Sequence, residues 1–565
     1  MLADARRVPA GAELEADLCI IGAGAAGITL AREFIGTRLK VILLESGGLE
    51  LDQRTQELYK GRSTGLPYFP LDTARLRYFG GSTNHWGGIC RPFDDLDFER
   101  RDWIPYSGWP IRRSDLDPYY PPAVEVVRLL SQDFSTTGWD ERDDLSPLDL
   151  DGRTVPRVAQ FVGEKSRSFG TDYRDEIRRA ANVRTYLQAN VEEIETDGTA
   201  RAARQVRVVT LAGNRFSVRA RYFVLAVGGI ENPRLLLASN RQQPHGLGNQ
   251  HDLVGRFFLE HPRFAAGILA PTDAELNVGF YEPHHVEDTE IQGYVAFPPE
   301  VQRAEGLVDV QVFLEPTYNA RFEAAFDSGD VDSLRTLSKG GGGSIGDFGS
   351  KLMDVVTDLT TGRDFTVPGA PLPVPYPDVV GKLLSSPSEV RDRIPDLLGD
   401  IAAWGYKRLS GAAPLEHVTL VTRLDPAPNP ASRVTLATSR DELGMPRAQL
   451  DWRLSSIDRR SAVRATELLG AAFARAGQGR VRLIVHEDDR SWPSDLAGGY
   501  HHMGTTRMSD DPKRGVVDRD CLVHGMANLF IAGSSVFPTG GSSPPTLTIT
   551  ALTLRLSDHL KRVMR

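Results

Sequence analysis

Hydrophobic and polar positions near the start of the chain follow a strand–helix–strand order. Residues 17–21 (DLCII) and 40–44 (KVILL) are short apolar runs rich in β-branched side chains, which indicate buried strands. Between them, residues 28–34 place apolar side chains at helical spacing. The pattern predicts a βαβ unit over about 14–50 and an α/β, Rossmann-like domain.

Strand-like alternation returns twice further along the chain. Residues 183–226 alternate apolar and polar side chains and are expected to rejoin the first domain. After His261 the pattern changes, and several short alternating runs are joined by Pro- and Asn-rich connections. They predict a mainly antiparallel sheet in a second domain, with strands at 308–314, 418–424, 433–437 and 448–454.

One segment departs from this plan. Residues 339–344 (KGGGGS) have the composition of a flexible linker, 345–359 predict a helix, and the Pro-rich run 367–377 should be extended. We interpret 328–400 as an inserted arm or lid. It could cover the active site, pack against another subunit, dock a partner, or be a surface excursion without such a role.

A glycine-rich turn follows the first predicted strand. Residues 22–27 read GAGAAG, with glycines at Gly22, Gly24 and Gly27. Such glycines permit a tight turn, close approach of backbone to a pyrophosphate, and packing of helix on strand. Glu45, at the end of the second strand, lies 18 residues beyond Gly27, near the spacing at which a carboxylate receives a ribose hydroxyl. The pattern favours FAD or NAD over NADP, the alternative being an ordinary Gly-rich turn.

The C-terminal part carries the strongest chemical signal. Residues 499–508 read GYHHMGTTRM, which places His501 and His502 on a Gly-bounded loop. Imidazole titrates near neutral pH, so either ring is a candidate proton acceptor. The apolar run 529–532 ends in Gly533 and Ser534, where backbone N–H groups can approach a ligand.

Composition narrows the class of protein. The 565 residues suggest two domains, and the net charge of −9 argues against nucleic-acid binding. The three cysteines (Cys19, Cys90 and Cys521) imply no disulfide framework, and no His/Cys/Glu cluster has metal-ligand spacing. No convincing secretory signal and no membrane-spanning run are recognised. A cytoplasmic, soluble enzyme is the expectation.

These motifs together resemble the glucose–methanol–choline (GMC) oxidoreductases, FAD enzymes that oxidise alcohols and sugars. The resemblance rests on the N-terminal Gly motif with Glu45, on residues 80–88 (GGSTNHWGG), on 223–236 (FVLAVGGIENPRLL), and on the C-terminal block. It is closest to the pyranose-oxidase and sugar-dehydrogenase branch. It implies a discontinuous FAD-binding domain (14–262 and 485–565, with a loop-rich cover over 61–155) and a substrate-binding domain over 263–484.

The family pattern His-x-x-Gly-Thr implies that His501 is the catalytic base. His502 competes for this role, although a packed or supporting histidine is the simpler interpretation. The second catalytic position, usually His or Asn, falls on Pro544 here. Proline offers no side-chain donor or acceptor. Ser543, His502 or a residue of the substrate domain could replace it, or a single histidine could suffice.

The resemblance also implies the cofactor contacts. His85 stands where several family members link histidine covalently to the flavin; a covalent and a non-covalent contact both stay open. Thr546 is expected near the pyrimidine edge of the flavin, or is simply a helix cap. Gly228 and Gly229, after a strand, could close over the dinucleotide. The expected cofactor-binding set is Gly22, Gly24, Ala26, Gly27, Glu45, Ser46, Gly81, Ser82, Asn84, His85, Trp86, Val191, Gly228, Gly533, Ser534, Pro545 and Thr546.

The function implied by the resemblance is oxidation of a secondary hydroxyl of a sugar or glycoside to a ketone. His501 would remove the hydroxyl proton and flavin N5 would receive the hydride. The electron acceptor, oxygen or another compound, is open, and a homo-oligomer is possible. Two alternatives remain: a dehydrogenase subunit that passes electrons to a partner, and a non-redox flavoprotein such as the hydroxynitrile lyase of this family.

Overall fold

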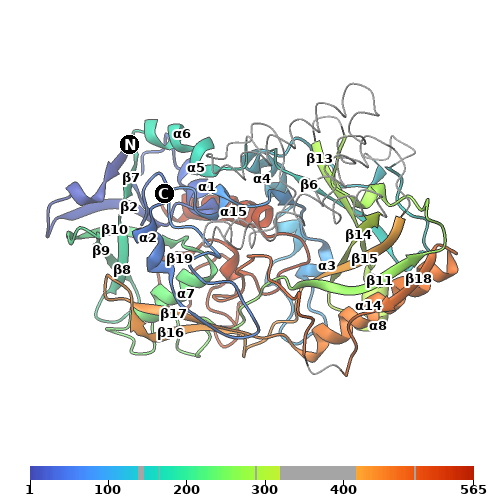
Figure 1. Ribbon diagram of the computed structural model, residues 1–565. Helices are drawn as coiled ribbons and strands as arrows, with labels where there is room; N and C mark the ends of the chain where they lie inside the picture. The colour runs from blue at the N-terminus through green and yellow to red at the C-terminus, as the bar shows by residue number, and fades with distance from the viewer. Residues whose placement is uncertain (138–144, 164–165, 287–288, 319–414, 489–490) are drawn as a thin grey trace, which may run out of the picture.

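The structure is a computed structural model that describes residues 1–137, 145–163, 166–286, 289–318, 415–488 and 491–565. The predicted arm at 328–400 lies outside the described residues. Two large sheets occupy the two ends of the molecule, and C-terminal segments run through the region between them (Figure 1).

The first sheet is the predicted Rossmann-like one. Its strands run in the order β1-β7-β3-β2-β10, all parallel, and β9 and β8 extend it in antiparallel fashion. A further strand, β19, lies parallel to the end of β10. The bounds are β1 (Leu2–Asp4), β2 (Glu13–Ile21), β3 (Val41–Leu44), β7 (Val183–Leu187), β8 (Asn190–Thr196), β9 (Ala203–Val209), β10 (Arg215–Leu225) and β19 (Leu529–Ile531).

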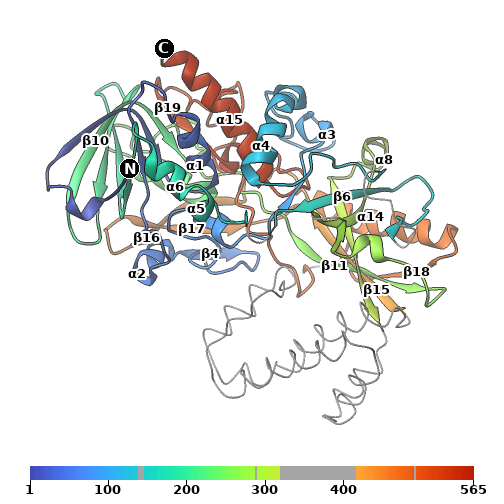
Figure 2. The same ribbon diagram turned by 90° about the horizontal axis from the view of Figure 1, so that it is seen from above.

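Helices cover the parallel part of this sheet. α1 (Ala25–Glu33) packs against the C-terminal helix α15 (Thr546–Val563), which in turn packs against α4 (Tyr120–Val127) (Figure 2). Strands β2 and β3 are almost wholly apolar where they are buried, as expected for parallel strands covered on both faces. The predicted βαβ unit is confirmed.

The second sheet is antiparallel throughout, in the order β18-β11-β15-β14-β13-β6-β5, with β12 paired to β13. The long helix α14 (Ser456–Arg475) packs against one face, and a second apolar core lies between them. The bounds are β5 (Ile89–Cys90), β6 (Val155–Phe161), β11 (Arg263–Pro271), β12 (His284–Val286), β13 (Thr289–Ala296), β14 (Val310–Tyr318), β15 (Leu415–Leu424) and β18 (Gly479–Leu483).

Two of the four strands predicted for this sheet lie elsewhere. β16 (Arg433–Arg440) and β17 (Pro446–Trp452) form a separate sheet with β4 (Arg62–Gly65), which runs parallel to β17. The prediction of their place was therefore wrong. A Cβ on Gly65 would lie 2.3 Å from the Trp452 carbonyl oxygen, so a glycine is needed for this approach.

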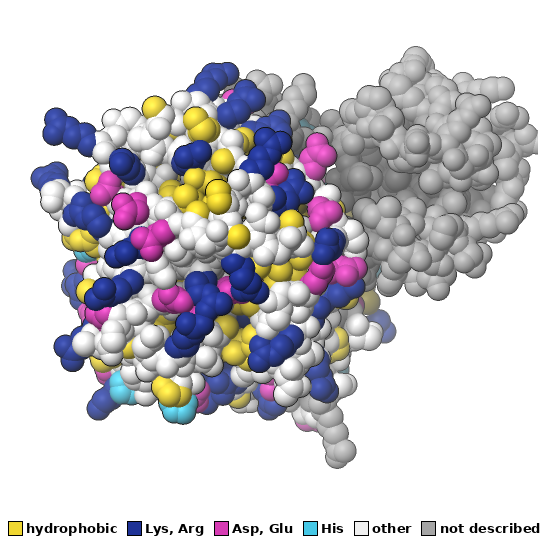
Figure 3. Space-filling view, turned by 90° about the vertical axis from the view of Figure 1, so that its left-hand side faces the viewer, with side chains coloured by type: hydrophobic (Ala, Val, Ile, Leu, Met, Phe, Trp, Pro, Cys, Tyr) yellow, Lys and Arg dark blue, Asp and Glu magenta, His cyan; other side chains and the backbone are white. Residues whose placement is uncertain are grey.

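Shorter helices complete the connections. α7 (Gly228–Ala238) follows β10 and packs against β16 and β17. The remaining ones are α2 (Gln53–Gln56), α3 (Asp95–Phe98), α5 (Phe169–Asp172), α6 (Arg174–Arg179) and α8 (Pro299–Glu305). The face on the side of the N-terminal strands carries Lys and Arg interspersed with Asp and Glu (Figure 3).

Candidate active site

Three glycine turns meet at the carboxyl ends of the parallel strands. Gly22 follows β2, Gly228 begins α7 after β10, and Gly533 follows β19. Gly22 has a φ of +102°, and a Cβ there would lie 2.6 Å from the Ala226 carbonyl oxygen. A Cβ on Gly27 would lie 1.8 Å from the Gly22 carbonyl oxygen, so helix α1 packs on its own strand only with glycine.

The other glycines face open space. A Cβ built on Gly24, Gly228 or Gly533 would meet no described atom within 4 Å. Gly24 is also the N-cap of α1 and has no side-chain cap, so the first amides of that helix are available to an anion. We call these glycine turns together the dinucleotide cradle. It leaves room for a pyrophosphate at Gly24, Gly228 and Gly533 and is closely packed at Gly22 and Gly27, so it fits the dinucleotide part of FAD.

Glu45 sits at the end of β3, buried beneath the cradle. Its Oε2 accepts the Ala23 amide at 2.9 Å and its Oε1 accepts the Gly47 amide at 2.8 Å. The carboxylate thus holds the glycine turn in place and retains lone pairs for a ribose hydroxyl. Ser46 places its hydroxyl 3.3 Å from the same carboxylate.

The loop around His85 lies across the cradle. The Gly80 amide donates to the Ala23 carbonyl at 2.8 Å, and a Cβ on Gly81 would lie 3.1 Å from the Gly24 Cα. His85 is exposed, with Nε2 2.9 Å from the Tyr78 hydroxyl, and partial desolvation lowers its pKa.

Neighbouring side chains fasten this loop. Asn84 donates to the Phe79 carbonyl at 2.9 Å, and Trp86 Nε1 donates to the Arg167 carbonyl. Ser82 accepts the Leu76 amide at 3.3 Å. Asn84, Trp86 and Ser82 thus all form hydrogen bonds with backbone groups of the protein. Their predicted contacts with the cofactor stay predictions.

The remaining predicted cofactor positions lie around the same cradle. Ala26 is buried in α1, and Val191 pairs with Val208 between β8 and β9. Ser534 donates to the His502 carbonyl at 2.8 Å. Pro545 is the N-cap of α15, and Thr546 is its first residue with no side-chain cap bond. The interpretation of Thr546 as a capping residue is therefore wrong, because the cap position falls one residue earlier.

His501 forms a pair with a second buried histidine. Its Nδ1 lies 2.8 Å from Nδ1 of His261, and His261 Nε2 lies 2.5 Å from the Gly541 carbonyl oxygen. A carbonyl only accepts, so His261 carries its proton on Nε2 and its Nδ1 accepts from His501. The neutral His501 therefore has its proton on Nδ1, and its Nε2 keeps a free lone pair.

Both rings are held neutral. Burial lowers the pKa of His501 well below its ordinary value, and His261, the Arg423 guanidinium and His502 lower it further. Burial and Arg423 likewise lower the pKa of His261 to about 3, against hydrogen bonds to Gly541 and Gly540 that raise it. A neutral imidazole with a free Nε2 can accept a proton.

Glu260 positions the histidine loop. Its buried carboxylate accepts the backbone amides of His261 (2.8 Å), Gly499 (3.0 Å) and His501 (2.9 Å). It also accepts the Tyr68 hydroxyl. Burial raises the pKa of Glu260 to about 7, although these hydrogen bonds oppose the rise.

His502 points to a different group. Its Nε2 lies 2.8 Å from the Tyr68 hydroxyl, and burial lowers its pKa to about 3. When Tyr68 donates to an ionised Glu260, His502 must donate to Tyr68. The two neighbouring histidines thus have different partners, His501 on His261 and His502 on the Tyr68–Glu260 side.

A buried acidic cluster anchors the loop that carries the expected second catalytic position. Asp425 accepts the Gly540 amide at 3.0 Å and pairs with Arg101 at 3.1 Å, and Asp309 accepts the Ser542 hydroxyl at 2.5 Å. Thr539 donates to the Asp97 carbonyl at 2.7 Å. The carbonyl of Gly541 in this loop is the acceptor for His261. The acidic cluster therefore fixes the position of the histidine pair.

The sequence did not predict His261, Glu260 or Tyr68 as site residues. There, His261 marks only a change of pattern. The signal is an acid next to a histidine just before β11, visible in residues 260–262 (EHP), but the burial of these residues is set by distant segments.

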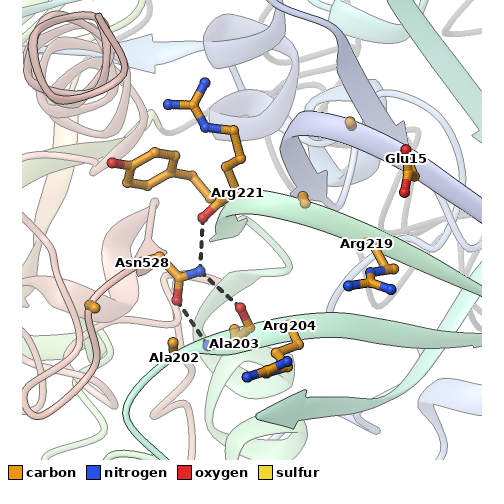
Figure 4. Close-up of a pocket in the computed structure, with 11 residues that line it drawn as sticks. Glu15, Ala202, Ala203, Arg204, Arg219, Arg221 and Asn528 are labelled. Carbon is orange, nitrogen blue, oxygen red and sulfur yellow. Dashed lines mark hydrogen bonds between the residues drawn. The ribbon is translucent and has the colours of Figure 1, made fainter. Parts of the chain in front are cut away.

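A surface groove lies away from this site. It has a volume of about 640 Å³, an alanine-rich floor, and a rim that includes Arg204, Arg219 and Arg221 (Figure 4). It is formed by early residues of β2 and β9 and the middle of β10, whereas the cradle lies beyond the carboxyl ends of the strands. Glu13 and Asp17 pair with Arg219 and Arg221 and offset their charge.

Within the described part of the chain, no group of three His, Cys, Asp or Glu is arranged to hold a metal ion. Cys19, Cys90 and Cys521 are buried and unpaired there. No helix among the described residues is both long and apolar enough to cross a membrane.

Comparison with known proteins agrees with this architecture. Residues 428–553 match the family model described as GMC oxidoreductase. The chain is 23% identical to 2-methyl-1,2-propanediol dehydrogenase of Mycolicibacterium austroafricanum (97% of this chain, 95% of that protein). It is 21% identical to the fructose dehydrogenase large subunit of Gluconobacter japonicus (97% and 98%).

A solved structure of Aspergillus oryzae formate oxidase, from a study of FAD modification, shares the fold. Its TM-score is 0.51 at 15% identity, over 98% of this chain and 99% of that one. The C-terminal family match and the two full-length relatives, together with the dinucleotide cradle, support an FAD-dependent oxidoreductase of the GMC type that acts on CH–OH groups.

Proposed function

We propose that this enzyme oxidises a secondary hydroxyl of a sugar or glycoside to a ketone, with His501 as the base. The fructose dehydrogenase relative supports the substrate class. The observation that carries the mechanism is the His501–His261 pair, because it leaves Nε2 of His501 as the proton acceptor. General base catalysis of this kind contributes about 10²–10⁴-fold in rate.

The chain's own residues perform the proton chemistry. His501 Nε2 takes the hydroxyl proton while its Nδ1–H stays on His261. Glu260 fixes the loop through three backbone amides and favours a positive charge on His501 once the proton has moved. When bound, FAD supplies the acceptor for the hydride that leaves the carbinol carbon. His502 supports the site through Tyr68; a direct catalytic role for it stays a prediction.

The cradle residues would hold the cofactor. Gly24 and the N-terminus of α1 would receive the pyrophosphate, Glu45 a ribose hydroxyl, and the loop with His85 the flavin end. We further propose that residues 14–262 and 485–565 form the FAD-binding domain and 263–484 the substrate-binding domain. β5 and β6 are then contributed to the substrate sheet from the first segment.

His85 is proposed to contact the flavin, with or without a covalent link. Its Nε2 is engaged by Tyr78, which fixes the ring against the cradle loop. Acid precipitation separates the two forms. A yellow pellet after centrifugation means a covalent flavin, and a yellow supernatant with a colourless pellet rules the link out.

The second candidate is a dehydrogenase that passes electrons to a partner protein. It is favoured by the relative that is a large subunit of fructose dehydrogenase. The first candidate needs no partner protein, and its electron acceptor is oxygen or another compound. A partner that co-purifies with the enzyme and is needed for turnover distinguishes the two.

An anaerobic absorbance titration tests the proposed function. The purified holoenzyme is mixed with monosaccharides, glycosides and simple alcohols, and bleaching of the flavin band by a sugar or glycoside is expected. Air is then admitted to find out whether oxygen restores the band. If no compound bleaches the flavin, the sugar assignment fails, and a non-redox or partner-dependent function becomes the better account.

A further inference from the structure

Arg423 lies on the face of the antiparallel sheet that contacts the loop of Gly541 and Ser542, the loop that binds His261. In the register, Arg423 of β15 is opposite Arg263 of β11 and Gln311 of β14. Asp425, two residues beyond Arg423, binds the Gly540 amide at 3.0 Å. This face of the sheet therefore adjoins the loop that holds His261.

The guanidinium of Arg423 is fixed on one edge only. Nε donates to Gln311 Oε1 at 2.9 Å, Nη2 donates to the same oxygen, and the group lies 4.9 Å above the Phe313 ring. Gln311 in turn donates to the Ser542 hydroxyl at 2.9 Å. Nη1, at the end of the guanidinium that points away from Gln311, has no hydrogen bond among the described contacts.

Arg423 also has no carboxylate in direct contact among the described residues, although the charge of Asp309 stabilises the cation from further away. No carboxylate of the described residues lies within 4 Å of it. Buried Arg101, in contrast, has one at 3.1 Å, and buried Arg234 has two, at 2.9 Å and 2.5 Å. Arg423 is nevertheless buried, and burial lowers its pKa to about 10. At neutral pH it remains a cation, and a buried cation without a partner is costly unless another charge meets it.

A developing negative charge is expected at this place. As His501 Nε2 takes the hydroxyl proton, the substrate oxygen becomes negative until the hydride leaves and the C=O bond forms. The position that supplies a side-chain donor in the family is Pro544 here, which has none. The Arg423 charge acts on both histidine rings, since it lowers the pKa of His501 and of His261.

We propose that Arg423, held by Gln311 and Phe313, donates from Nη1 to the substrate oxygen that loses its proton to His501. It supplies the donor that Pro544 cannot. This inference rests on the proposed function, because it assigns a second residue to the same reaction. The hydroxyl proton goes to His501, the hydride with its electron pair goes to the oxidised flavin, and the oxygen lone pair completes the ketone.

Arg423→Gln and Arg423→Lys test this role in the holoenzyme. Anaerobic rapid mixing measures flavin reduction by the best substrate. The rate is expected to fall about 10²–10³-fold in Arg423→Gln, the usual loss for one such donor. The Lys variant keeps the charge and should retain part of the rate. FAD content should not change. Guanidinium ion at sub-denaturing concentration should restore part of the rate to Arg423→Ala.

Arg459→Gln is the matched control. Arg459 is also buried without a described carboxylate within 4 Å, and lies 4.4 Å above the Trp492 ring. Trp492 packs on Phe264, which points to the opposite face from Arg263. Its substitution should leave flavin reduction within about twofold of the parent and should show no guanidinium rescue. Equal loss in the Arg423 and Arg459 variants overturns the proposal.

A binding measurement keeps the test independent of turnover. Sodium acetate, whose carboxylate imitates the negative substrate oxygen, is titrated into the oxidised holoenzyme while the flavin absorbance is recorded. Saturable binding is expected, with Kd raised at least about tenfold, or ~1.4 kcal/mol, in Arg423→Gln and unchanged in Arg459→Gln. If no sugar reduces the flavin, the proposed function fails. The titration still tests whether Arg423 binds a negatively charged oxygen in the site. Absent binding, or the same Kd in both variants, overturns the proposal.

Discussion

His501 and His261 share a hydrogen bond of 2.8 Å between their Nδ1 atoms, although 240 residues separate them in sequence. Because His261 Nε2 is committed to the Gly541 carbonyl, the bond has one direction, from His501 to His261. The protein thereby selects the tautomer of its base. The pair joins the loop at 499–504 to the start of the antiparallel sheet, so the base belongs to both halves of the molecule.

Replacing His261 should therefore impair catalysis without removing the cofactor. In His261→Asn, His501 loses the acceptor that fixes its tautomer, and flavin reduction is expected to slow by about 10²-fold or more. Rapid mixing with substrate measures the rate, and absorbance after denaturation measures FAD content. His524→Asn is the control, since His524 Nε2 also contacts a carbonyl, that of Ser509 at 2.8 Å, outside the site. Similar rates in both variants would contradict the assigned role.

Two glycines of the cradle should respond differently to substitution. In Gly24→Val the new side chain meets no described protein atom near its Cβ but occupies the space proposed for the pyrophosphate. The apoprotein should keep its unfolding midpoint while FAD binding is lost. Gly27→Ala places a Cβ 1.8 Å from the Gly22 carbonyl oxygen and should destabilise the fold itself. Thermal unfolding with and without added FAD separates these outcomes. Normal FAD content in Gly24→Val would mean that the cofactor lies elsewhere.

The dependence on pH should contain an inflection near 7 that belongs to Glu260. Burial raises the pKa of that carboxyl to about 7, and its negative charge favours proton uptake by His501, so flavin reduction should speed up as pH rises through 7. The lowered pKa of His501 moves the loss of its base form to more acidic pH. In Glu260→Gln the inflection near 7 should disappear. An unchanged inflection in this variant would assign it to another group.

Glu260 also has a predictable effect on stability. Its folded pKa, about 7, exceeds the ordinary value of 4.5, so the folded protein binds more protons than the unfolded chain between these pH values. The free energy of unfolding should therefore fall as pH rises from about 4.5 to about 7. Denaturant titrations at several pH values measure this contribution as the difference between the parent and Glu260→Gln. A difference that does not vary with pH would contradict the raised pKa.

The Arg101–Asp425 ion pair should matter for stability more than surface pairs do. Its side chains are 1% and 0% exposed, and Asp425 holds the Gly540 amide. Arg101→Met leaves a buried carboxylate unpaired and should cost about 3–5 kcal/mol of unfolding free energy. Arg54→Met, which breaks an exposed pair with Glu442, should cost no more than about 1 kcal/mol. Chemical denaturation compares the two, and equal costs would mean that Asp425 has another partner.

The dinucleotide cradle could be predicted because its signal is local. A strand, a glycine turn, a helix and a second strand ending in Glu45 lie within a few dozen residues. Gly22 and Gly27 each lie against nearby backbone that leaves no room for a side chain. Likewise, the alternation of 433–437 and 448–454 predicted strands correctly. Their sheet could not be predicted in the same way, since β17 pairs with residues 62–65, nearly four hundred positions earlier.

The catalytic surroundings were only half predictable. His501 stands in a recognisable motif, but its partner does not: nothing in residues 260–262 alone indicates that Glu260 and His261 are fully buried and meet a loop 240 residues away. The empty donor position at Pro544 could be read from the sequence, whereas Arg423 became a candidate only when the register of β11, β14 and β15 placed it beside that loop.

The base assigned to His501 is tested most directly by single-turnover flavin reduction in His501→Ala. The parent and variant holoenzymes are mixed anaerobically with the substrate that bleaches the flavin, and FAD content is measured in both. Full FAD content and a rate lowered by about two or more orders of magnitude are expected. An unchanged rate, or loss of FAD with the fold intact, would contradict it and make His501 a structural residue.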